Sequence, residues 1–218
     1  ERVTAVLGAI REALAAGDSS AVGALFQGLL LTGVAMTMAE SSAPASGGEH
    51  LISHSLDMLA DQAGIPHDLH GRQVGVRTIL AAALYERLLA QESPNWRAAP
   101  EEVDRQFWGG LAEGVAAYYA KKSPRRAQAL AWLRQGSNWD KLREDLAGFL
   151  RPPARIRDCL RRAGAAWRAE EIGCECRRLA EVMAHAHELR DRFTILDLAQ
   201  MSGLLPETAE ELVREWCS

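Results

Sequence analysis

Apolar residues recur at helical spacing through nearly the whole chain, and the alternation typical of strands is scarce. A first apolar stripe consists of Val3, Val6, Leu7, Ile10 and Leu14, and it stops at Gly17. A second stripe follows Gly71 and consists of Val74, Ile79, Leu80, Leu84 and Leu88. The pattern shows no repeat period. It therefore predicts an all-α fold, with residues 1–218 forming a single helical domain.

The segment 21–38 carries no charged residue and is nearly long enough to cross a bilayer. It contains three glycines, Gln27 and two threonines, and it lacks the basic and aromatic anchors that flank a spanning helix. Asp18, just before it, offers a side chain for an N-cap. A helix buried on all sides explains this composition as well as a membrane span does, and we favour the buried helix and expect no membrane span.

Proline and glycine divide the rest of the chain into shorter helices. The turn at 41–48, rich in Ser, Pro and Gly, separates the apolar segment from a helix that begins near Glu49. Ser123 followed by Pro124 predicts the start of a new helix, because proline is favoured at the first helical position. The basic pairs on either side, at 121–122 and 125–126, are predicted to be solvated helix ends.

Composition and charge exclude several classes of function. The net charge is −4 and the basic residues are scattered, whereas a phosphate-binding surface for nucleic acid needs clustered cations. No GxGxxG, Walker loop or βαβ alternation is present to hold a dinucleotide. Cys174 and Cys176 are too close for a usual zinc site, so the four cysteines are expected to be reduced thiols without chemistry in a cytoplasmic protein.

Three of the six histidines fall close together, and they are the candidate chemistry of the chain. His50 and His54 are four residues apart, so both emerge from one face of a helix. His70 follows a loop that contains Pro66, and a pair of antiparallel helices joined there would bring His50 and His70 together. Imidazoles in this position suit zinc, but the spacing alone favours histidines that bind nothing.

The residues around these histidines change that balance. SSAPASGGEHLISH, followed by LHGRQVGVRTILAAALYERLL, resembles the glycerol-1-phosphate dehydrogenase family, where the pattern typically reads SSRPASGxEHxxSH and then HGxxVGxGT. That family is grouped with iron-containing alcohol dehydrogenases, glycerol dehydrogenase and dehydroquinate synthase. The ending DRFTILDLAQMSGLL is similar to RYTxLDLAxxLGLL of the same group. The resemblance implies the multi-helix C-terminal domain of a dehydroquinate synthase-like fold, with the nucleotide-binding α/β domain outside this chain.

The resemblance also implies roles for individual residues. His50 and His70 match two metal ligands, and His54 matches a histidine that contacts substrate beside the metal. Ser46, in the small-residue turn, is a weaker candidate for substrate contact. The family's third ligand is an aspartate that would precede Glu1. Glu49 is a poor replacement, because it points about 100° around the helix from His50.

The implied reaction is hydride transfer between NAD(P)H and dihydroxyacetone phosphate, giving sn-glycerol 1-phosphate, with Zn²⁺ or another divalent metal as cofactor. NAD or NADP would bind mainly to the missing half, so this chain alone is expected to be catalytically incomplete. Three residues depart from the family pattern, namely Ala43 in place of arginine, Arg72 in place of a glutamate or other polar residue, and Arg77 in place of glycine. Ala43 puts the phosphorylated substrate in question. A non-enzymatic helical binding or oligomerisation domain, and a related polyol dehydrogenase, stay open as alternatives, as does a homo-oligomer.

Overall fold

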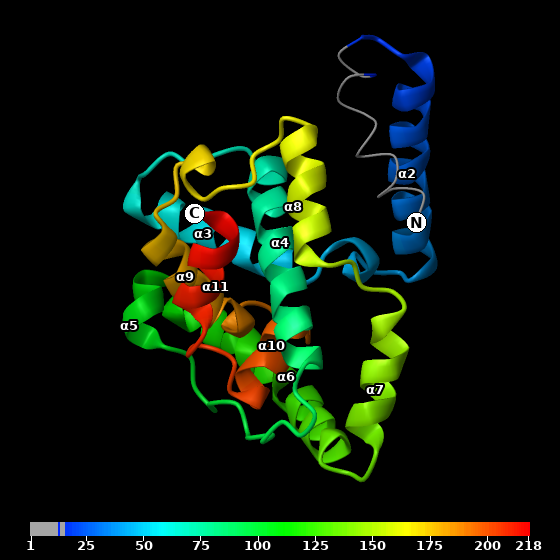
Figure 1. Ribbon diagram of the computed structural model, residues 1–218. Helices are drawn as coiled ribbons and strands as arrows, with labels where there is room; N and C mark the ends of the chain where they lie inside the picture. The colour runs from blue at the N-terminus through cyan, green and yellow to red at the C-terminus, as the bar shows by residue number, and fades with distance from the viewer. Residues whose placement is uncertain (1–12, 14–15) are drawn as a thin grey trace.

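The computed structural model describes Ala13 and residues 16–218, and in that part of the chain all regular structure is helical, with no strand. The all-α prediction is confirmed for these residues. The five residues of the first apolar stripe, from Val3 to Leu14, lie outside the described residues. Figure 1 labels the principal helices along the chain. The α-helices are α2 (Ser19–Met38), α3 (Gly48–Ala63), α4 (His70–Leu89), α5 (Arg105–Trp108), α6 (Ala112–Leu133), α7 (Asn138–Ala147), α8 (Pro153–Arg162), α9 (Cys176–His185), α10 (Ile195–Ser202) and α11 (Ala209–Cys217). Short 3-10 turns at Ala43–Ala45, Gly109–Leu111, Glu170–Ile172 and Ala186–Glu188 connect some of them.

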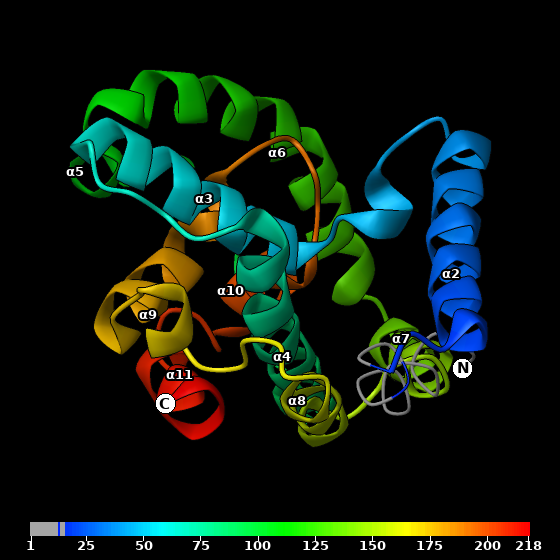
Figure 2. The ribbon, with the colours of Figure 1, turned by 90° about the horizontal axis from the view of Figure 1, so that it is seen from above.

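Helix α4 is the centre of the packing. It contacts α3, α8, α10 and α11, and the two views show it running through the middle of the molecule (Figures 1 and 2). Ile79, Leu80 and Leu84 on this helix are completely buried. The second apolar stripe of the sequence, from Ile79 to Leu88, therefore forms the core-facing side of α4, while Val74 near the start of the helix is only partly buried.

The connection between α3 and α4 differs from the antiparallel pair expected from the sequence. Helix α3 ends at Gly64, whose left-handed φ of 65° stops the helix. Residues 65–69 have no helical structure, and the chain doubles back along α3 before α4 starts and crosses it (Figure 2). Five to six extended residues span about 15–20 Å. That reach explains how the first residue of α4, His70, returns to the N-terminal part of α3.

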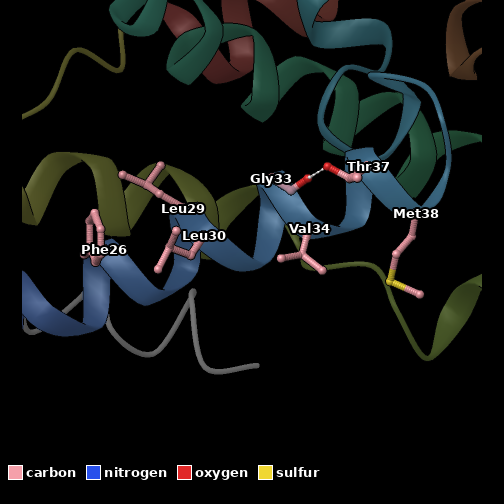
Figure 3. A pocket seen from close by; sticks show the side chains of 7 residues that line it. All are labelled: Phe26, Leu29, Leu30, Gly33, Val34, Thr37 and Met38. Atoms are coloured by element: carbon pink, nitrogen blue, oxygen red, sulfur yellow. Dashed lines mark hydrogen bonds between the residues drawn. The ribbon is translucent and has the colours of Figure 1, made fainter.

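Helix α2 corrects the expectation of a buried apolar helix. Asp18 caps it as predicted, accepting from the backbone N–H of Ser20 and Ala21, but none of its residues is buried. Phe26, Leu29, Leu30, Val34 and Met38 line an open apolar hollow of about 550 Å³ on its surface (Figure 3). In the described part of the chain, α2 is the one helix long and apolar enough to cross a membrane by length and composition.

Helix α6 corrects two further expectations. Pro124 lies inside this continuous helix and does not open a new one. Residues on both sides of Pro124 are held in the core: Lys122 is fully buried, and the guanidinium of Arg126 stacks 3.6 Å from the ring centroid of Tyr119. These contacts outweigh the one backbone hydrogen bond that proline removes. Lys122 and Arg126 are therefore not solvated helix ends.

Candidate metal centre

The small-residue turn before α3 is held by the segment that precedes α10. Arg192 donates to the carbonyl of Ser46 and, at 2.9 Å, to the hydroxyl of Ser42. A side chain at Gly48 would meet Ile195 at 2.8 Å, so only glycine allows the first turn of α3 to pack so closely against α10. The two most distinctive sequence motifs of the chain therefore contact each other directly and fix the start of α3.

The three histidines converge at the crossing of α3 and α4. The ring centroids of His50 and His70 are 5.4 Å apart, and those of His54 and His70 are 4.9 Å apart with nearly parallel planes. His50 and His54 are separated by 6.2 Å, one turn apart on the same face of α3. The structure thus brings together all three histidines named from the sequence.

His70 lies beside two oxygen atoms of α3. Its Nδ1 is 3.2 Å from the hydroxyl of Ser53 and 3.3 Å from a carboxylate oxygen of Asp57. The other oxygen of Asp57 accepts from the side-chain amide of Gln73 at 2.8 Å and lies 3.2 Å from Nδ1 of His67. Ser53 and Gln73 are buried, so His70 rests on a largely buried polar support.

His50 has a comparable neighbour. Its Nδ1 is 2.8 Å from the carboxylate of Glu49, and the same oxygen accepts from the backbone N–H of Gly47 at 2.8 Å. Glu49 is therefore placed beside Nδ1 of His50, as Asp57 is placed beside Nδ1 of His70.

The closest group of potential metal ligands differs from the pair His50 and His70 that the sequence predicted. Among the described residues, possible ligand atoms of His54, Asp57 and His70 all lie within 4.8 Å of one another, and His50 is not part of this set. Both oxygens of Asp57 already face hydrogen-bond donors, which favours Asp57 as an orienting acceptor. Asp57 lies on the same face of α3, three residues after His54, and this spacing was the signal in the sequence that could have found it.

His54 is electrostatically distinct from its neighbours. Burial lowers the pKa of this imidazole, and the positive charge of Arg190 and the nearby His70 and His50 lowers it further. Arg190 has a φ of 62°, in the left-handed region that non-glycine residues seldom adopt. It also lines a cavity of about 460 Å³ together with Met58, one turn beyond His54 on α3. Nothing in the helical spacing pointed to Arg190.

The remaining candidates occupy different positions. Ser46 lies at the end of the turn, where its carbonyl accepts from Arg192. The turn has Ala43 where the family pattern has an arginine. The guanidinium of Arg192, from the segment before α10, contacts the same turn at the hydroxyl of Ser42. His185 lies far along the chain from the three histidines and stacks on Phe107, with the two ring centroids 4.2 Å apart.

The donor set fits a divalent cation. Neutral imidazole nitrogens are common zinc ligands. A carboxylate beside Nδ1 is the usual outer partner of a metal-bound histidine, and His50 and His70 each have one. These residues would leave both Nε2 atoms for the cation. In the described part of the chain, the structure is therefore all-helical and brings together imidazole and carboxylate groups that could hold a metal.

Comparison with known proteins identifies relatives of this domain. No family model matches the chain. The glycerol-1-phosphate dehydrogenase [NAD(P)+] of Methanosarcina acetivorans is 32% identical over 187 residues, which is 85% of this chain and 32% of the relative. That of Geobacillus stearothermophilus is 31% identical over 84% of the chain and 39% of its own length. That of Thermococcus kodakarensis is 29% identical over 91% of the chain and 36% of its own length.

The chain is similar to glycerol-1-phosphate dehydrogenases over most of its own length, as the sequence motifs imply. It spans about a third of the length of the curated relatives it matches.

Proposed function

We propose that this chain is the C-terminal, metal- and substrate-binding part of an NAD(P)-dependent sn-glycerol-1-phosphate dehydrogenase. The reaction would be hydride transfer between NAD(P)H and dihydroxyacetone phosphate. The observation that carries the proposal is the convergence of His50, His54 and His70 at the crossing of α3 and α4. It is supported by relatives that bear this enzyme's name.

Each histidine has a separate role in the proposal. His50 and His70 would hold a divalent cation, which supplies Lewis-acid polarisation of the substrate oxygen when it is bound. His54 stacks on His70 and faces the same centre, so it would hydrogen-bond a substrate hydroxyl and orient the reacting carbon. Burial lowers the pKa of His54 and so favours the neutral imidazole, which can both donate and accept a hydrogen bond. Ser46 would contribute from the turn.

The nicotinamide nucleotide is assigned mainly to sequence outside this chain. The described residues include no strand from which a dinucleotide fold could be built, and the relatives are about three times as long as the matched region. The nicotinamide supplies the hydride. The helical domain would contribute the placement of the substrate and the electrostatics around it.

A steady-state assay of the protein expressed from its complete gene tests the proposal. We expect oxidation of NADH or NADPH in the presence of dihydroxyacetone phosphate. His54→Ala should lower kcat/KM by about 100-fold or more, because misplacing the substrate is costly. His185→Ala, whose imidazole stacks on Phe107 outside the histidine centre, serves as the control and should retain the wild-type rate. Turnover of unphosphorylated polyols alone would favour a related polyol dehydrogenase, and no turnover would favour a non-enzymatic binding domain.

A further inference from the structure

The side chains under His70 form a chain of hydrogen bonds whose direction is determined by Gln73. The amide nitrogen of Gln73 faces two acceptors: it donates to Asp57 at 2.8 Å and to the backbone carbonyl of Asp68 at 3.0 Å. The reverse orientation of the amide would place its oxygen against both of those oxygens. The amide orientation is therefore fixed by its neighbours.

The orientation of Gln73 determines the direction of the next bond. Its amide oxygen accepts the hydroxyl hydrogen of Ser53 at 3.0 Å. A serine hydroxyl has one hydrogen, so Ser53 can only accept in its 3.2 Å contact with Nδ1 of His70. An ionised Asp57 can likewise only accept, in its 3.3 Å contact with the same nitrogen. Both oxygen atoms near Nδ1 of His70 therefore require a hydrogen on that nitrogen.

From this geometry we infer that Ser53, Asp57 and Gln73 lock His70 in the tautomer with hydrogen on Nδ1. The lone pair then lies on Nε2, ready to bind a cation before any cation arrives. Ser53 is completely buried and Gln73 nearly so, which makes a reversed network costly because it would leave unpaired polar atoms. All three are positioning residues that act through His70, and nothing in the assigned metal role of His70 requires them.

This inference rests on the proposed metal role of His70, and it makes Asp57 the most important of the three. Removing an outer partner of a metal-bound histidine typically lowers metal affinity 10- to 100-fold. Asp57→Asn replaces one acceptor oxygen by a donor, so one of the hydrogen bonds from Gln73 and His70 is lost. Asp61→Asn is the matched control, because Asp61 lies one turn further along α3 and contacts His67 but not His70.

Nitrogen NMR of histidine-labelled protein from the complete gene, stripped of metal, tests the tautomer directly. Long-range proton–nitrogen spectra distinguish the two ring nitrogens, and a His70→Gln sample assigns the signal. We expect the neutral form of His70 to carry its hydrogen on Nδ1 in the wild type. Hydrogen on Nε2 would overturn the inference, even in a protein that turns over dihydroxyacetone phosphate normally.

Zinc affinity, measured by competition with a chelator, supplies a second readout. We expect Asp57→Asn to weaken zinc binding 10- to 100-fold and Ser53→Ala to weaken it less, with Asp61→Asn equal to wild type. Equal zinc affinity in Asp57→Asn and wild type would contradict the role of Asp57. Either contrary result would remove this inference. If the wild type still oxidised NAD(P)H with dihydroxyacetone phosphate, the proposed function would stay in place.

Discussion

Lys122 of α6 and Asp197 of α10 form an ion pair of 2.8 Å in which both side chains are completely buried. Lys122 also donates to the carbonyl of His187, and Asp197 accepts from the backbone N–H of Thr194 as part of the capping box of α10. Burial lowers the pKa of Lys122, and Asp197 counteracts that effect. The pair connects α6 to the segment that packs against the start of α3.

Lys122→Ala should destabilise the fold by about 3–5 kcal/mol, because it leaves the buried carboxylate of Asp197 without its charged partner. Urea unfolding followed by circular dichroism measures this change. Lys121→Ala is the matched control, since Lys121 is exposed and lies over the ring of Tyr118 at 4.9 Å. A similar, small loss for both variants would show that the pair does not contribute.

Arg77→Met should stabilise the protein by about 1–3 kcal/mol. Arg77 is 1% exposed, and its Nε and Nη1 have no hydrogen-bond partner among the described residues. Burial lowers the pKa of the guanidinium to about 10, so it stays charged at pH 7 and bears the cost of desolvation. The midpoint of thermal unfolding should rise for Arg77→Met and stay unchanged for Arg155→Met, because the side chain of Arg155 is exposed on α8. A lower midpoint for Arg77→Met would mean that the guanidinium has a stabilising partner.

Gly48→Ala should disturb the start of α3, because the new methyl group would lie 2.8 Å from Ile195 and 3.2 Å from Leu196. We expect a loss of stability of about 1–3 kcal/mol from this overpacking. Gly71→Ala is a close control, since a methyl group there meets nothing within 4 Å and should gain about 0.5–1 kcal/mol from helix propensity. Equal effects of the two substitutions on the unfolding midpoint would rule out the tight contact.

Cys217 should resist alkylation in the folded protein. It is fully buried, and burial raises the pKa of its thiol to about 12, so the reactive thiolate is about one part in 10⁴ at pH 8. Mass spectrometry after treatment with iodoacetamide should find Cys217 unmodified until urea unfolds the chain. Cys159 and Cys176, which are half-buried, should be modified before Cys217. Rapid native modification of Cys217 would contradict the packing of α11 against α4.

Periodicity was sufficient for the helical class and for the buried side of α4, because both depend on local spacing. The Ser123–Pro124 start signal was misleading, and so was the assignment of Lys122 to a solvated helix end, since only tertiary contacts reveal that both lie within one helix anchored in the core. The same limit applies to α2. Its apolar composition predicted a buried helix, but burial depends on which segments pack against it, and none of its residues is buried.

The histidine centre could be anticipated in part. The four-residue spacing of His50 and His54 placed them on one face, and the resemblance added His70. The path that brings His70 back depends on the extended residues 65–69, for which the sequence offered only Pro66 and Gly71 as signals. Asp57 was detectable from its position on the same face of α3, whereas Gln73 and Arg190 become visible only when the segments meet in space.

The central claim is that His50 and His70 together hold one divalent cation. Zinc per protomer, measured by mass spectrometry on the purified protein from the complete gene, tests it most directly. The predicted result is close to one zinc in the wild type and in His185→Ala, and a large loss in both His50→Ala and His70→Ala. Full zinc content in either of these two variants would contradict it.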